Sequence, residues 1–166
     1  MTSDLLLRDV REDDLPIFFE QQLDPDANYM AAFISRNPAD RDAFTAHWNK
    51  ILSDRTTTNK TILFAGRVVG HIASFQRLGK PEVTYWIGKE YWGKGLATRA
   101  LSEFLRQVKE RPVYARVAKD NTASLRVLEK CGFRISGEDK GFSNARGGEV
   151  EELILELRAD GRDSAP

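Results

Sequence analysis

The spacing of apolar residues changes sharply near the middle of this 166-residue chain, and that change constrains the fold more than any other feature. Three β-rich runs come first, each bounded by a short turn: 61–65, 68–75 and 82–87. Short turns between such runs predict an antiparallel meander. From Ala97 to Val108, apolar residues then recur at steps of three and four, which predicts a helix with one buried face.

The other segments complete a single mixed domain. We expect a strand at 5–8, helices beginning near 13 and 38 with irregular chain at 22–37, a strand at 113–117, a short helix at 121–131, and strands at 133–136 and 149–157. The order β-α-α-β-β-β-α-β-α-β-β predicts an α+β fold with a largely antiparallel central sheet flanked by helices. We place the domain at 1–158 and a flexible tail at 159–166.

Composition excludes several classes of protein. Lys plus Arg equals 25 and Asp plus Glu equals 25, so the formal net charge is zero and no nucleic-acid partner is expected. One cysteine, Cys131, leaves no disulfide framework and no multi-cysteine zinc site, so no metal is expected. The chain contains neither a run of about 18 apolar residues nor a secretory signal. We therefore expect a cytoplasmic protein that does not bind membranes.

The loop between the meander and the long helix has the features of an anion site. Gly93 and Gly95 allow backbone angles that side chains disfavour, and Lys94 between them adds a positive charge. Unpaired N–H groups at a helix start, helped by the helix dipole, bind phosphates. The pattern is neither a P-loop nor a complete G-x-G-x-x-G fingerprint. A tight turn with glycines needed only for packing is the alternative.

Two motifs resemble the GNAT acyltransferase superfamily. Gly95 and Ala97 match its R/Q-x-x-G-x-G/A loop, although Trp92 stands at the R/Q position. The segments 85–87 (Y-W-I) and 92–98 (W-G-K-G-L-A-T) are similar to the RimJ/RimL-like branch. Residues 121–133 resemble the N-x-x-S-x-x-V-L-E-K-x-G-F motif. The resemblance extends over residues 5–157 in the expected order.

The resemblance implies that acetyl-CoA is bound as the acyl donor, without a metal. Its coenzyme-contacting positions in this chain are Trp86, Ile87, Trp92, Gly93, Lys94, Gly95, Leu96, Ala97, Thr98, Asn121, Ser124 and Lys130. It also implies a backbone N–H near Ile87 that stabilises the oxyanion. In the family, a bulge there separates the strand from its neighbour and leaves an edge for the pantetheine arm.

Acetyl transfer to an amine needs a base and benefits from a donor to the departing thiolate. Glu82 begins the third meander strand and occupies the position where the branch carries its proposed base; an exposed strand-edge carboxylate is the alternative. Ser124 is the family-matched acid, and the alternative is that it satisfies a backbone N–H at the helix start beside an Asn121 cap. We expect His71 to be a core or surface residue of its strand rather than a catalyst, and His47, beside Trp48 on a helix, to face solvent.

The acceptor should bind near the early helices. Tyr29, Phe33, Trp48 and Glu82 are the candidates, although these aromatics suit a core equally well. The sequence thus predicts an acetyl-CoA-dependent N-acetyltransferase acting on a primary amine, in a small molecule or at a peptide N-terminus, by direct attack in a ternary complex. An acyl-CoA-binding sensor or scaffold without turnover is the main alternative, and a nucleotide-binding protein is a more distant one. The family forms monomers and homodimers.

The zero net charge is a sum of unlike segments. Residues 1–30 carry eight acidic and two basic side chains, whereas residues 89–130 carry ten basic and five acidic ones. This distribution favours an anionic ligand near the glycine loop and a cationic amine approaching from the other half.

Overall fold

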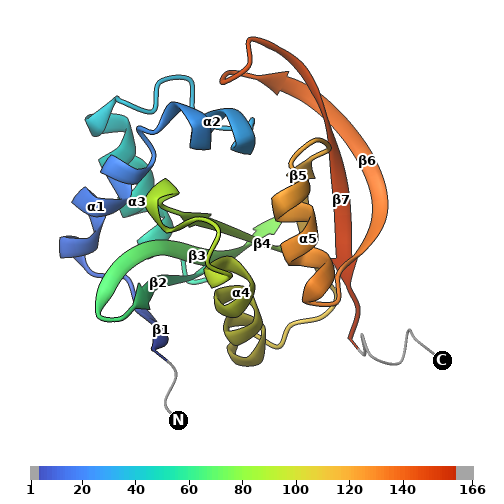
Figure 1. Ribbon diagram of the computed structural model, residues 1–166, viewed down its shortest axis with the longest axis horizontal. Helices are drawn as coiled ribbons and strands as arrows, with labels where there is room; N and C mark the ends of the chain where they lie inside the picture. Colours follow the sequence, from blue (N-terminus) through green and yellow to red (C-terminus); the bar gives the residue numbers. More distant parts are fainter. Residues whose placement is uncertain (1–3, 160–166) are drawn as a thin grey trace.

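A seven-stranded sheet with the strand order β1-β2-β3-β4-β5-β7-β6 organises residues 4–159, which the computed structural model describes (Figure 1). The strands are β1 (Leu5–Asp9), β2 (Thr58–Phe64), β3 (Arg67–Arg77), β4 (Lys80–Ile87), β5 (Val113–Ala118), β6 (Arg134–Ser143) and β7 (Gly148–Leu157). The α-helices are α1 (Leu15–Gln21), α2 (Pro25–Ala31), α3 (Arg41–Ser53), α4 (Leu96–Gln107) and α5 (Thr122–Lys130), with short 3-10 turns η1 (Glu12–Asp14) and η2 (Lys89–Tyr91). All but Ala159 of the predicted tail at 159–166 lies outside the described residues.

The α+β class and the largely antiparallel sheet are confirmed, since only β4 and β5 run parallel. The prediction of irregular chain throughout 22–37 is wrong, because α2 lies inside it. The Asp24 carboxylate accepts from the N–H groups of Asp26 at 2.8 Å and Ala27 at 3.4 Å, and Pro25 occupies the first helical position. What resembles a turn in sequence is therefore a capped helix start.

The two faces of the sheet carry separate cores, because side chains alternate along each strand. Ile72 and Tyr85 lie opposite each other on β3 and β4 and face the core that includes α4 and α5. His71 and Trp86 form the next pair and point to the other face, where α1 and α3 pack. Helices therefore flank the sheet on both sides, as the sequence predicts.

The tip of the β6–β7 hairpin reaches α2 (Figure 1). The Ser143 hydroxyl donates to the Ala32 carbonyl at 2.5 Å, and the Asn144 amide donates to the Ile34 carbonyl at 3.1 Å. Arg146 donates to the Tyr29 carbonyl at 2.9 Å, and its guanidinium lies 4.3 Å from the centre of the Tyr29 ring. These contacts hold α2 and the chain after it against the far end of the sheet.

His71 is packed among aromatic rings on the α1 side of β3. Its ring centre lies 4.7 Å from that of Phe18 and 5.0 Å from that of Trp48. Burial, together with the neighbouring His47, lowers the pKa of His71 from 6.5 to about 4. The imidazole is therefore neutral in the folded protein, which agrees with a structural role.

This burial should make the fold sensitive to acid. The unfolded chain binds a proton at His71 below about pH 6.5 and the folded chain only below about pH 4, so stability should fall as the pH drops through that window. We expect a loss of up to about 3 kcal/mol in the free energy of unfolding, measured with urea at several pH values. His71→Phe should flatten this dependence, whereas His47→Gln, on the exposed side of α3, should leave most of it, because burial is the larger cause of the lowered pKa. A dependence unchanged in His71→Phe would contradict the prediction.

Candidate active site

Strands β4 and β5 meet at one point and then separate. Glu82 and Tyr114 are their single pair of Cα partners within residues 4–159. By contrast, β3 and β4 stay in continuous register from Arg77 and Lys80 up to the last residue of β4, Ile87. The divergence of β5, rather than a shift of β4 against β3 at Ile87, therefore leaves the β5-facing edge of β4 without a strand partner.

Two backbone N–H groups lie on this open edge. The N–H of Gly88 donates to the Val69 carbonyl of β3 at 2.9 Å. Because backbone groups alternate along an antiparallel strand, the N–H groups of Tyr85 and Ile87 point away from β3, toward β5. Either N–H can donate to a ligand that lies along β4 or to a negative charge that develops beside it.

The glycine loop after β4 has the geometry of an anion site. Gly93 and Gly95 adopt φ angles of 79° and 75°, in the left-handed region that favours glycine. A methyl group placed on either residue would meet no atom of the described chain within 4 Å, so backbone conformation rather than crowding requires glycine there. Gly95 is the N-cap of the twelve-residue helix α4 and makes no side-chain cap bond.

The first N–H groups of α4, on Leu96, Ala97 and Thr98, are therefore available to an anion. Their arrangement fits the diphosphate of a coenzyme. Lys94 is exposed in the loop and lies within this arrangement. At the far end of α5, the Cys131 thiol contacts the Thr98 carbonyl at 3.7 Å, and the neighbouring Lys130 is exposed.

Trp92, which departs from the R/Q pattern of the family, anchors the loop. Its indole N–H donates to the Ile87 carbonyl at 2.8 Å, and its side chain is 42% exposed. The bond connects the glycine loop to the end of β4. Trp92 thus holds the backbone of the glycine loop in place, at the position where the family pattern has a polar side chain.

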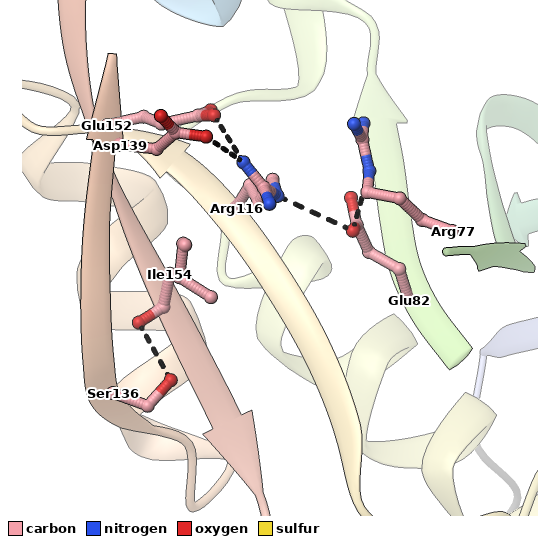
Figure 2. A network of polar contacts seen from close by, with 7 residues as sticks. All are labelled: Arg77, Glu82, Arg116, Ser136, Asp139, Glu152 and Ile154. Carbon is pink, nitrogen blue, oxygen red and sulfur yellow. Dashed lines mark hydrogen bonds and ion pairs between the residues drawn. The ribbon is translucent and has the colours of Figure 1, made fainter. Parts of the chain in front are cut away.

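Glu82 lies in a network of charged groups that crosses the sheet (Figure 2). It is 7% exposed, so the alternative of an exposed edge carboxylate is excluded. Its Oε1 lies 2.9 Å from Arg77 Nε and 3.7 Å from Arg116 Nε. Arg116 Nη1 donates in turn to Asp139 at 3.0 Å and to Glu152 at 2.8 Å. Burial raises the pKa of Glu82, and the two arginines oppose that shift.

Ser124 pairs with Tyr85 across the space between α5 and β4. The two hydroxyl oxygens are 2.7 Å apart, and burial raises the pKa of Tyr85 to about 12. Asn121 caps α5 by accepting from the Ser124 N–H at 3.2 Å, as the alternative interpretation expects. The Ser124 hydroxyl, however, is paired with Tyr85 rather than with a backbone N–H. Sequence reasoning missed Tyr85 as its partner because the two residues are 39 positions apart.

The candidate residues lie on two faces of β4. Glu82, Thr84 and Trp86 share the α1 face, and Tyr85 lies on the α4 face. Thr84 is exposed in the middle of the sheet, so solvent reaches the α1 face there. The predicted coenzyme residue Trp86 points away from α4, and its buried Nε1 has no hydrogen-bond partner among the described residues.

The predicted acceptor residues are divided by burial. Tyr29 is 52% exposed on α2, and Phe33 is 39% exposed just after it. Trp48 is only 4% exposed, with its ring centre 5.2 Å from that of Phe18 and 6.2 Å from that of Phe44. Its assignment to the acceptor site is corrected here, because an indole packed on all sides belongs to the core.

The predicted charge separation is partly cancelled by ion pairs. Four of the eight acidic residues in 1–30 have basic partners: Asp4 with Arg99, Asp9 with Lys60, Asp14 with Arg8, and Asp26 with Lys89. The first and last of these pairs join the acidic segment to the basic one. Long-range attraction of a cationic amine by residues 1–30 is correspondingly weaker than the sequence suggests.

Other kinds of site were sought across residues 4–159. In that range, no three His, Cys, Asp or Glu side chains converge in a way that could hold a metal ion. Within the same residues, every helix is too short or too polar to cross a membrane.

The candidate site is thus a mixed sheet that opens between β4 and β5, beside a glycine loop at the start of α4. Residues 4–134 match the acetyltransferase (GNAT) domain. The chain therefore belongs to the GNAT acetyltransferase family, whose members use acyl-CoA.

Similarity to individual proteins agrees with this family. The chain is 29% identical over 117 residues to a candidate ribosomal N-acetyltransferase, YdaF of Bacillus subtilis, with 64% of each chain covered. It is 26% identical over 86 residues to the uncharacterized N-acetyltransferase p20 of Bacillus licheniformis, covering 49% of this chain. The matched segments span 48% of p20 and 64% of YdaF.

Solved structures share the fold. Mycobacterium smegmatis RimJ in complex with CoA-disulfide superposes with a TM-score of 0.79 at 23% identity, covering 98% of this chain and 84% of RimJ. Spermidine N-acetyltransferase from Vibrio cholerae, in complex with CoA and spermine, superposes with a TM-score of 0.77 at 20% identity, covering 93% and 96%.

Proposed function

We propose that this protein is an acetyl-CoA-dependent N-acetyltransferase that moves the acetyl group to a primary amine by direct attack in a ternary complex. One observation carries the proposal. A buried carboxylate, Glu82, lies where β4 pairs with β5, and a hydroxyl pair, Tyr85 with Ser124, lies on the opposite face of β4 where its open edge begins. Such a site can accept a proton on one side and donate one on the other.

In this proposal each group has a defined task. Acetyl-CoA supplies an activated thioester. Glu82 removes a proton from the ammonium or from the attacking amine on the α1 face, and the N–H of Tyr85 or Ile87 stabilises the charge that develops on the acetyl oxygen. Ser124 donates a hydrogen bond to the departing thiolate, which takes up a proton from water, and the proton held by Glu82 is returned to water before the next turnover.

The coenzyme is proposed to lie along the open edge of β4, with its diphosphate on the first turn of α4. The residues proposed to hold it are Ile87, Trp92, Gly93, Lys94, Gly95, Leu96, Ala97, Thr98, Asn121, Ser124 and Lys130. Trp86 is left out because its side chain points to the other face. Equal numbers of acidic and basic residues and a single unpaired cysteine support a cytoplasmic protein. We propose that it is either a monomer or a homodimer.

The acceptor is proposed to approach the α1 face near Tyr29 and Phe33. A methyl group placed on Gly141 of β6 would lie 3.6 Å from Phe33, which locates that ring over the same face as Glu82. The fold is shared by RimJ and by a spermidine N-acetyltransferase. Both peptide N-termini and polyamines therefore belong in the acceptor panel.

The test is to incubate the protein with acetyl-CoA and a panel of amines and peptides while following the release of free thiol. Thiol release that depends on an acceptor, with acetylated product seen by mass spectrometry, supports the proposal. Binding of acetyl-CoA without release for any acceptor would favour a sensor or scaffold. Calorimetry with ATP and NAD beside acetyl-CoA excludes a nucleotide-binding protein if only acetyl-CoA binds.

Ser124→Ala should lower kcat by about tenfold to a hundredfold and leave the affinity for acetyl-CoA within a few-fold, since the lost hydrogen bond acts on the thiolate as it forms. Steady-state kinetics with calorimetry of acetyl-CoA binding measures both quantities. Ser102→Ala, on the exposed side of α4, is the matched control and should behave as wild type. Full activity of Ser124→Ala would remove the proposed donor.

A further inference from the structure

Arg116 is the side chain at which four strands are connected (Figure 2). It projects from β5 and reaches Glu82 on β4, Asp139 on β6 and Glu152 on β7. Its side chain is 21% exposed, and the Glu152 side chain is 13% exposed, so this part of the network is largely shielded from water. The network lies beside Glu82 and Tyr114, the single pair of Cα partners that β4 and β5 form in the described chain.

Two arginines make their nearest approach to Glu82 at the same carboxylate oxygen. Arg77 Nε and Arg116 Nε both approach Oε1, at 2.9 Å and 3.7 Å. Positive charge from β3 and from β5 therefore converges on this one buried carboxylate.

The two arginines are held to different degrees. The Arg77 side chain is 49% exposed near the end of β3, and its only ion pair in the described chain is with Glu82. Arg116 is fixed from behind, because its Nη1 donates to Asp139 and Glu152. Two carboxylates on the hairpin thus determine where the Nε of Arg116 points.

We propose that Arg116 is a positioning residue for the acetyl transfer: it holds Glu82 from β5 and offsets part of the negative charge of that carboxylate. The inference rests on the proposed function, in which Glu82 takes up the proton of the amine. It adds that the hairpin carboxylates act on the reaction through Arg116.

The network predicts that two substitutions shift the pKa of Glu82 in opposite directions. The charged or titratable groups around Glu82 are Arg77 from β3, Arg116 and Tyr114 from β5, Glu152 from β7, Asp139 from β6 through Arg116, and Lys80 from β4 itself. Arg116 lowers the pKa of Glu82, and Glu152 raises it. Arg116→Gln should therefore move the titration of Glu82 to higher pH, and Glu152→Gln should move it to lower pH.

Two measurements on the full chain test the proposal. Carbon-13 NMR of glutamate-labelled protein follows the Glu82 carboxyl titration directly, with the resonance assigned by its loss in Glu82→Gln. The pH profile of kcat/KM then shows whether the acid limb of acetyl transfer moves with that titration. At a pH below the acid limb of the Arg116→Gln profile, this variant should lose about tenfold or more in kcat/KM relative to wild type. Arg116→Lys should recover part of that loss because it keeps the positive charge.

Lys119→Gln is the matched control. Lys119 follows β5 and pairs with Glu138 at 3.8 Å and Glu151 at 4.0 Å, so its removal disturbs the same hairpin without touching Glu82. Its NMR titration and its acid limb should coincide with those of wild type. Because Glu152→Gln removes a charge while keeping a hydrogen-bonding oxygen for Arg116, it tests the sign even if Arg116→Gln does not fold.

Each outcome has one meaning. Opposite shifts of both the NMR titration and the acid limb support the proposal. Shifts in the same direction, or an acid limb that stays in place while the NMR titration moves, overturn it. If no amine is acetylated, the proposed function fails and the catalytic use of Arg116 fails with it, whereas the NMR titration still reports whether Arg116 controls Glu82.

Discussion

Replacing Glu82 by Gln should lower kcat/KM for acetyl transfer by about 10²-fold to 10⁴-fold, the contribution of a well-placed general base. Glutamine has nearly the shape of glutamate but cannot take a proton from the amine. In the wild-type protein, activity should fall as the pH drops through the pKa of Glu82, since the carboxylate is the active form. Because burial raises that pKa, the decline should begin at a higher pH than for an ordinary glutamate. Initial rates measured across pH check both expectations.

A change of charge alone must be separated from the loss of the base. Glu129→Gln removes a carboxylate from the exposed side of α5 and should keep the wild-type rate and pH profile. Circular dichroism and acetyl-CoA affinity establish whether Glu82→Gln is folded. A folded Glu82→Gln protein with an unchanged rate at every pH would leave Glu82 as an ion-pair partner only.

The second large effect concerns the glycine loop. Gly95→Val should weaken acetyl-CoA binding by about tenfold or more. A β-branched residue disfavours the left-handed backbone conformation that Gly95 adopts at the start of α4, where the N–H groups of the first turn would bind the anion. The same strain should cost about 1–3 kcal/mol of stability. Calorimetry with acetyl-CoA and urea unfolding measure the two losses separately.

Gly79→Val separates strain from binding. Gly79 lies in the β3–β4 turn with a φ of 79°, and a methyl group placed there also meets no atom of the described chain within 4 Å. It should therefore lose similar stability while retaining acetyl-CoA affinity. Equal losses of affinity in both variants would mean that global destabilisation, and not the loop, accounts for the effect.

The parts of the fold that the sequence predicts are those with local causes. The meander, the amphipathic α4 and the glycine loop follow from spacing and turn residues within a few positions of each other. The helix α2 is missed because Asp24 and Pro25 indicate a turn and a capped helix start equally well. Sequence alone does not say whether the chain after them continues as a helix.

The candidate site is less predictable because its partners come from distant segments. Nothing near Glu82 in sequence indicates Arg116, Asp139 or Glu152, which reach it only because β5, β7 and β6 lie in that order beside β4. Trp48 shows the opposite limit. An aromatic residue on an amphipathic helix suits a binding surface and a core alike, and only packing against Phe18 decides between them.

The separation of β5 from β4 beyond their one pair of Cα partners in the described chain also has a consequence for the entropy of ligand binding. The open edge of β4 is held in place by its continuous pairing with β3, so its backbone is already ordered before anything lies along it. A ligand with amide groups can pair with that edge much as another strand would, and little further ordering of the protein is then required. The open edge of β4 is in this sense a preorganised binding site.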